Sequence, residues 1–361
     1  MTPVGVYIHV PFCATKCPYC DFYSEKYSSE LVKSYKNAVI RRIMAYPYRT
    51  AVDTIYFGGG TPSLISEKYI EEILNALYSH FSVKSLETTI EVNPKTVNYY
   101  KLSAYHSMGI NRLSIGVQSC NDKELEFLGR KHSWKNSFET IENAARAGFD
   151  NISCDLMIGL DGQTISSLRS SINTLVKLPI QHISSYMLKI EANTPFNCES
   201  IISRLPDEDA YADMYLFMVD HLNSKGFAQY EISNFARSGF ESIHNNKYWQ
   251  CKEYIGIGPS AHSYFNGKRY TSDINLEQFI SSENADHIIT DDNPCSYEER
   301  LMLGLRLKKG IRISDFPELD KKLQRLGKEM LKNELIEIKD NVLSLTAKGF
   351  LISNSIISSL L

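Results

Sequence analysis

The chain has 361 residues, 43% of them hydrophobic and 22% charged, with a formal net charge of −3. This length predicts about two domains around a substantial core, and the near-neutral charge gives no general argument for nucleic acid or an acidic membrane as a partner. Eight scattered cysteines exclude a disulfide scaffold. No basic and apolar leader opens the sequence, and no run approaches the ~18 apolar residues of a membrane span. We therefore expect a cytoplasmic protein.

The first half of the sequence alternates β-branched runs with segments of helical periodicity. Strands are predicted at residues 4–10, 52–57, 86–92, 112–117, 151–158 and 182–188, and helices between them at 31–44, 70–78 and 168–176. Strands separated by helices imply βαβ units and a parallel sheet. Each strand runs into polar or glycine residues, as the carboxyl ends of barrel strands do at an active site. The pattern predicts an incomplete (β/α)6 TIM-like barrel.

Three cysteines follow the first strand at the spacing C-x3-C-x2-C: Cys13, Cys17 and Cys20. Three thiolates on one short loop can hold three corners of a cubane iron–sulfur cluster and leave one iron open to a substrate. Two other interpretations stay open. The cysteines could be buried structural thiols, or they could bind zinc with His9 as the fourth ligand.

Other candidate residues lie at the ends of the later strands: residues 58–61 (Gly-Gly-Gly-Thr), Glu91, Gln118, Arg130 and Asp155. The glycines let the backbone approach a ligand closely, but they match neither phosphate-binding fingerprint. Glu91 alternates with apolar neighbours, which directs it toward the lumen. Arg130 suits bidentate capture of a carboxylate, and a buried Asp155 needs a partner such as a ribose diol or a cation. For each one alone, a turn, surface or ion-pair role remains the alternative.

The motifs YIHVPFC, CPYCDF, FGGGTPSL, IEVNP, GINRLSIGVQS, LGRKHS, SSYMLKIEANTPF and YEISNFAR occur in this order over about the first 237 residues. Together they resemble the anaerobic coproporphyrinogen oxidase group of the radical S-adenosylmethionine (SAM) superfamily. The resemblance implies a [4Fe–4S] cluster on Cys13, Cys17 and Cys20, with SAM bound at the open iron. In the superfamily an electron from the cluster cleaves SAM to a 5′-deoxyadenosyl radical. It implies SAM contacts from Tyr7, Tyr19, Gly59, Gly60, Thr61, Glu91, Gln118, Arg130 and Asp155. The sequence departs from the pattern at Cys120, Asp161 and Pro259, which neighbour the motifs.

Two features separate the branches of this group. The true oxidases carry a fourth cysteine two residues after the third, where this chain has Phe22. Residues 244–249, His-Asn-Asn-Lys-Tyr-Trp, resemble the H-N-x-x-Y-W signature of HemW-like heme chaperones. The resemblance implies a heme site made by His244, Asn245, Tyr248 and Trp249, with His244 as an axial ligand and the aromatic rings stacked on the macrocycle. The alternative is a packed loop whose aromatics close the barrel.

The end of the sequence predicts a different architecture. Residues 240–285 lack a clear pattern and are expected to be irregular. Helices at 297–307 and 319–332, a hairpin of 335–338 with 342–345 and a last helix over 346–357 predict a small winged-helix-like domain. The expected organisation is a partial barrel over 1–237, a connecting segment over 238–290 and a C-terminal domain over 291–361. Its excess of lysine is assigned to solubility, so no nucleic-acid partner is expected.

The resemblance leads to one main expectation and two alternatives. We expect a chaperone of the radical SAM fold that binds the cluster, SAM and heme and delivers heme to acceptor proteins, membrane-associated ones included. An electron donor for the cluster is also implied, and a homodimer is left open. The enzyme alternative is an oxygen-independent coproporphyrinogen III oxidase, but that activity is predicted to be absent, while SAM cleavage is left open. The third interpretation is a binding protein in which a cluster or zinc is only structural.

Overall fold

The computed structural model describes residues 2–272, 275–282 and 288–361. In this part of the chain, strands form one large sheet in the order β14-β13-β12-β11-β1-β4-β5-β6-β7-β8-β10-β9. The predicted strands form its parallel centre: β1 (Val4–Val10), β4 (Ala51–Gly59), β5 (Ser82–Val92), β6 (Arg112–Gln118), β7 (Ile152–Ile158) and β8 (His182–Met187). Within the described residues no ladder joins β8 back to β1, so the barrel is incomplete as predicted.

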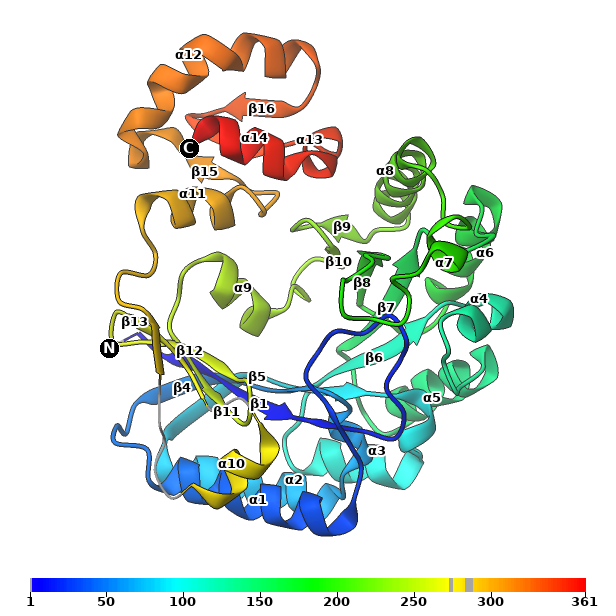
Figure 1. Cartoon of the computed structure of the whole chain (residues 1–361), viewed down its shortest axis with the longest axis vertical. Helices are drawn as coiled ribbons and strands as arrows, with labels where there is room; N and C mark the ends of the chain where they lie inside the picture. Colours follow the sequence, from blue (N-terminus) through cyan, green and yellow to red (C-terminus); the bar gives the residue numbers. More distant parts are fainter. Residues whose placement is uncertain (1, 273–274, 283–287) are drawn as a thin grey trace.

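Helices surround the outside of the curved sheet (Figure 1). They are α1 (Ser29–Met44), α2 (Glu67–His80), α3 (Tyr99–Ser107), α4 (Asp122–Phe127), α5 (Trp134–Arg146), α6 (Ile165–Leu175), α7 (Glu199–Ile202) and α8 (Glu208–Ser224). Helices α1, α2 and α6 confirm the three helices predicted from the sequence. Polar residues begin several helices, and α5 and α6 start with complete capping boxes at Ser133 and Thr164. No helix in the described ranges is long and apolar enough to cross a membrane.

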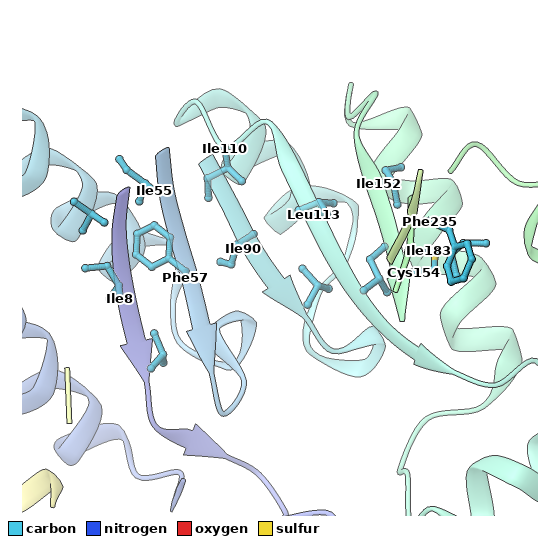
Figure 2. Packing of buried hydrophobic residues seen from close by; sticks show 14 of the residues in the cluster. Ile8, Ile55, Phe57, Ile90, Ile110, Leu113, Ile152, Cys154, Ile183 and Phe235 are labelled. Atoms are coloured by element: carbon cyan, nitrogen blue, oxygen red, sulfur yellow. The ribbon is translucent and has the colours of Figure 1, made fainter. Parts of the chain in front are cut away.

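The two faces of the central strands differ in chemistry. Alternate residues such as Ile8, Phe57 and Ile90 are fully buried and pack with the outer helices in the main core (Figure 2). The intervening positions carry polar side chains, and Tyr56 and Glu91 bond to each other across the inner face. A polar inner face is unusual for a barrel that only needs to pack, because such interiors are normally filled by branched apolar residues. The lumen is therefore built to receive a polar ligand.

The expectation that residues 240–285 are irregular is wrong. The structure places there α9 (Ile243–Trp249), β11 (Tyr254–Ile257), β12 (His262–Phe265), β13 (Lys268–Thr271) and α10 (Leu276–Ser281), followed by β14 (Ile288–Asp291). Residues 273–274 and 283–285 of this segment lie outside the described residues. These strands are too short to show an alternating pattern, and β11 is stabilised by parallel pairing with β1 at the opposite end of the sequence. On the other edge, β10 (Asn234–Ala236) pairs with β8 and with β9 (Ala228–Gln229).

The C-terminal domain contains the predicted helices and hairpin. Its elements are α11 (Tyr297–Gly304), β15 (Ile311–Arg312), α12 (Pro317–Lys332), β16 (Ile336–Lys339), β17 (Val342–Leu345), α13 (Ala347–Leu351) and α14 (Ser353–Leu360). The expected single last helix is wrong, because it is interrupted at Ile352. Backbone bonds from Ile232 to Arg306 and from Lys308 to Tyr230 join this domain to the barrel.

Candidate functional site

The cysteine loop, residues 13–20, follows β1 and is held from several sides. Backbone bonds from Gly60 to Val10 (2.8 Å) and from Thr61 to Phe12 (2.8 Å) attach its start to the end of β4. The short strands β2 (Phe12–Cys13) and β3 (Glu25–Lys26) pair on the other side. Further along the loop, the Tyr19 ring packs 6.0 Å from the Phe196 ring. The loop therefore has a defined position at the carboxyl end of the strands.

All three cysteines are reduced and partly exposed. The Cys13 Sγ lies 3.6 Å from the Thr61 hydroxyl, and the Arg130 Nη1 donates to the Cys17 Sγ at 3.4 Å. The described residues contain no group of three or more histidine, cysteine or acidic side chains that could hold a single metal ion. A cubane instead places each thiolate on a different iron, so its ligands lie farther apart. Three accessible thiols on one loop beside a fixed cation suit such a cluster.

The zinc alternative requires His9 as the fourth ligand, and this ring is already hydrogen-bonded on both sides. The His9 Nδ1 lies 3.1 Å from the Tyr7 hydroxyl, and its Nε2 lies 3.2 Å from the Tyr23 carbonyl. Both ring nitrogens are thus engaged, and burial lowers the pKa of His9, which favours the neutral ring. His9 acts in the structure as a support beneath the cysteine loop.

The glycine-rich turn brings the backbone to Glu91. The Gly59 N–H donates to one carboxylate oxygen of Glu91 at 3.1 Å, while the Tyr56 hydroxyl donates to the other at 3.0 Å. A Cβ at Gly60 would lie 2.8 Å from the Phe12 carbonyl oxygen. Gly60 is therefore required by contact with the start of the cysteine loop, and a larger residue there would displace that loop before it affected a ligand.

Two buried carboxyl groups give the lumen its electrostatic character. Burial, together with the charge of Asp155, raises the pKa of Glu91 to about 7. Burial likewise raises the pKa of Asp155 to about 6, although the Ser114 hydroxyl donates to it at 3.2 Å. No ion pair within the described residues reaches either carboxyl group. A cationic ligand that also offers hydroxyl groups would stabilise both ionised carboxylates.

The remaining candidates complete the open end of the lumen. Gln118 has a φ of 67°, beside a bulge in β6, a conformation that often occurs at binding sites. Arg130 donates to the Gly116 carbonyl at 3.1 Å, which orients its guanidinium toward Cys17. Its Nε has no hydrogen-bond partner among the residues that the structure describes. Surrounding protein atoms raise the pKa of Tyr186, although 44% of its surface is still exposed to water. Tyr186 therefore lies on the wall of a concave surface.

The sequence reasoning missed several lumen residues: Tyr56, Glu87, Arg112, Ser114 and Tyr186. The signal that identifies them is the alternation in β4 through β8, which places every second residue of a strand on the inner face. Arg112 is fully buried and lies 4.0 Å from the Glu87 carboxylate, which is buried too. This pair lies deeper in the lumen than Glu91.

The segment with the H-N-x-x-Y-W motif is a helix inside the barrel. The Glu87 carboxylate accepts backbone N–H bonds from Ile243 (2.7 Å) and His244 (3.0 Å), and so caps the start of α9. The His244 ring is fully buried, with its nitrogens 2.9 Å from the Thr54 hydroxyl and 2.9 Å from the Tyr248 hydroxyl. Burial lowers the pKa of His244 to about 3, so the ring is neutral. In this position α9 closes the amino end of the lumen.

The heme contacts expected from this motif remain a prediction. His244 has no free ring nitrogen in the structure, so it could reach a heme iron only if α9 moved. Asn245 and Trp249 are partly exposed, and the Arg306 guanidinium lies 6.0 Å from the centre of the Trp249 ring. The outer side of α9 therefore faces the C-terminal domain.

Comparison with known proteins supports the architecture and identifies the family. The radical SAM superfamily model matches residues 7–175, and the HemN C-terminal domain model matches residues 294–352. The solved coproporphyrinogen III oxidase (HemN) of Escherichia coli has the same fold, with a TM-score of 0.82 over 99% of this chain and 90% of that one at 21% identity. The fold and the cysteine loop thus define a radical SAM protein.

Two curated relatives are similar over nearly their whole length. The heme chaperone HemW of Bacillus subtilis (strain 168) is 35% identical, covering 99% of this chain and 99% of the relative. The heme chaperone HemW of Lactococcus lactis (strain IL1403) is 32% identical, covering 99% and 97%. The chain belongs to the HemW family, which confirms the resemblance found in the motifs.

Proposed function

We propose that this protein is a heme chaperone that binds a [4Fe–4S] cluster, SAM and heme and passes heme to acceptor proteins. The observation that carries the proposal is the convergence of the cysteine loop, Arg130 and the Gly59–Glu91 contact at the open end of a polar lumen. The heme part is supported by the names of the full-length relatives and by Phe22, which stands where the true oxidases carry a fourth cysteine.

The residues at the open end suit the parts of SAM. Cys13, Cys17 and Cys20 would hold the cluster, which when bound supplies an open iron and an electron. Glu91 offers a carboxylate to the ammonium group, and Arg130 offers a guanidinium to the carboxylate. Asp155 is available to the ribose hydroxyls. The proposed contacts are completed by Tyr7, Tyr19, Gly59, Gly60, Thr61 and Gln118.

The heme site is proposed at α9, through His244, Asn245, Tyr248 and Trp249. Because both ring nitrogens of His244 are engaged, axial ligation requires that α9 leave the lumen. We therefore expect heme to increase amide hydrogen exchange over residues 243–249, because the N–H groups of Ile243 and His244 would lose their bonds to the Glu87 carboxylate. Heme binding with unchanged protection of α9 would exclude His244 as the ligand.

The cellular setting is part of the proposal. A cluster with an exposed iron requires reducing conditions, so we place the protein in the cytoplasm. An electron donor would serve the cluster, and the heme acceptors would include membrane-associated proteins. A homodimer stays open.

The function is tested on anaerobically reconstituted protein by following heme absorbance and coproporphyrinogen turnover in parallel. We expect saturable heme binding and no protoporphyrinogen formation with SAM and a reductant. His244→Ala should alter the heme spectrum, whereas His262→Ala, at an exposed histidine on β12, should not. Sustained decarboxylation by the wild type that survives loss of His244 would instead identify an oxidase.

A further inference from the structure

A second group of cysteines lies far from the cysteine loop, where the barrel meets the C-terminal domain. Cys251 lies two residues after the end of α9, and Cys295 directly precedes Ser296, the N-cap of α11. These two residues belong to segments that are well separated in sequence, yet they are in contact. The proposed heme and SAM sites use neither of them.

The two cysteines are in direct contact. The Cys295 thiol donates to the Cys251 carbonyl at an Sγ–O distance of 3.8 Å, which places its sulfur beside Cys251. Both are reduced and partly exposed, so a small reagent can reach them. Each residue has a positive φ, 49° for Cys251 and 60° for Cys295, a conformation that non-glycine residues adopt only when their surroundings hold them. The fold therefore maintains this contact at both backbones.

Burial limits the reactivity of one of the two thiols. Burial raises the pKa of Cys251, and its contact with Cys295 raises it further. The Cys295 N–H donates to the Glu299 carboxylate at 2.6 Å, and Arg269 pairs with the same carboxylate at 2.5 Å. Cys251 therefore favours the protonated form, so Cys295 is the thiol expected to react first.

We propose that Cys251 and Cys295 form a reversible dithiol–disulfide pair that ties the end of α9 to the start of α11. With a low-molecular-weight disulfide as oxidant, the Cys295 thiolate attacks one sulfur and releases one thiolate of the reagent. Cys251 then loses its proton and attacks the Cys295 sulfur of this mixed disulfide, which releases the second thiolate. The two protein thiols lose two electrons, and the reagent gains them.

The cross-link has a structural consequence that can be measured. It closes the loop between residues 251 and 295 and fixes α11 against the end of α9, which stabilises the folded state relative to the unfolded chain. It also opposes the movement of α9 that heme ligation by His244 requires. This last consequence rests on the proposed function, whereas the disulfide itself does not.

The proposal is tested by treating the cluster-loaded protein anaerobically with oxidised glutathione. After alkylation of remaining thiols and tryptic digestion, we expect peptide 248–252 to be joined to peptide 270–300, and dithiothreitol to separate them. Cys251→Ser should trap glutathione on Cys295, whereas Cys295→Ser should leave Cys251 largely unmodified. Cys198→Ser, at an exposed cysteine elsewhere, should still form the cross-link.

Two results would overturn the proposal. One is full alkylation of both cysteines in the wild type after a treatment with oxidised glutathione that modifies Cys198. The other is equal capture of glutathione by the two single variants, together with no cross-link in the wild type. The melting midpoint of the wild type should rise on oxidation and return on reduction, while both single variants stay unchanged. If the cross-link forms but heme binding is unaffected, the disulfide stands and the proposed movement of α9 does not.

Discussion

The Glu91 carboxyl group is predicted from the sequence, lies in the lumen and is proposed to bind the ammonium group of SAM. Its place between two apolar residues of β5 turns it inward, where Tyr56 and Gly59 donate to it. No cation among the described residues forms an ion pair with it. Its pKa is raised to about 7 from an ordinary 4.5, mainly by burial and then by the charge of Asp155. The ligand-free site therefore holds a proton near neutral pH, and a cationic ligand has to displace it.

This proton gives SAM binding a defined pH dependence. Below about pH 7 the free site is protonated at Glu91, whereas the ammonium of SAM favours the ionised form. We expect affinity to fall as the pH drops from about 8 to about 6, approaching tenfold per unit once Glu91 is mostly protonated. Calorimetric titration in buffers of different ionisation enthalpy should detect proton release.

Glu91→Gln should weaken SAM binding by roughly 10- to 100-fold at about pH 8, since a charged hydrogen bond contributes about 1.5–3 kcal/mol. It should also flatten the pH profile and leave only the contribution of Asp155 near about pH 6. Glu71→Gln, at an exposed position of α2, should change neither property. An affinity that does not change with pH in the wild type would show that Glu91 does not face the ligand's charge.

At the scale of elements, the long parallel strands can be predicted from the sequence, whereas the buried position of α9 cannot. Strands β1 and β4 through β8 could be predicted because each is long enough for its β-branched residues to form a pattern. The polar residues at their ends could be assigned to one site because parallel strands share an edge. The burial of His244 could not be predicted, since it depends on Thr54 and Glu87, which lie on distant strands.

The same limit applies to the strands that follow α9. Each of β11 through β13 has four residues, and β11 is defined by its pairing with β1. Four residues are too few for a periodic signal, and long-range pairing leaves no local trace in the sequence. The contact of Cys251 with Cys295 is also long-range, so the sequence alone does not predict it.

The anchor of α9 leads to a prediction about stability. Glu87→Gln keeps the shape of the side chain but removes the charge that faces Arg112 and two helix N–H groups. Because breaking a buried pair leaves an uncompensated charge, we expect a loss of about 3–5 kcal/mol in the free energy of unfolding. Amide exchange over residues 243–249 should increase, while cluster content stays the same.

A surface pair provides the control for this variant. Glu139→Gln removes the exposed partner of Lys135 on α5, a type of pair worth less than about 1 kcal/mol. Urea unfolding of both variants should therefore show whether the loss of stability comes from the buried position of Glu87 or from the removal of any negative charge. Equal stability of the two variants would mean that Glu87 does not hold α9.

At the scale of the whole molecule, the barrel depends on residues beyond its predicted end at 237. Parallel pairing joins Gly5 to Tyr254 and Ile8 to Ile257, so β11 covers the free edge of β1. Without residues 238–257 this edge would be exposed, and the lumen would be open at its amino end. The proposed site at the carboxyl end of the strands thus depends on α9 and β11, which close the amino end and the free edge of the barrel.

Two truncations test this dependence. A chain of residues 1–237 should aggregate or unfold without cooperativity, whereas residues 1–293, which retain α9 and β11, should unfold cooperatively at a lower temperature than the full chain. Circular dichroism during heating provides the measurement. If residues 1–237 alone bound cluster and SAM like the full chain, the proposed closure would be unnecessary.

The electron paramagnetic resonance spectrum of the reduced, anaerobic protein, recorded with and without SAM, shows whether the cysteine loop holds a cluster with an open iron. We expect about four irons and four sulfides per chain and a spectrum that SAM perturbs. Cys17→Ala should abolish the signal, while Cys198→Ala should preserve it. Stoichiometric zinc without acid-labile sulfide would show that the loop holds no cluster, and a cluster spectrum that SAM leaves unchanged would show that SAM does not bind the open iron.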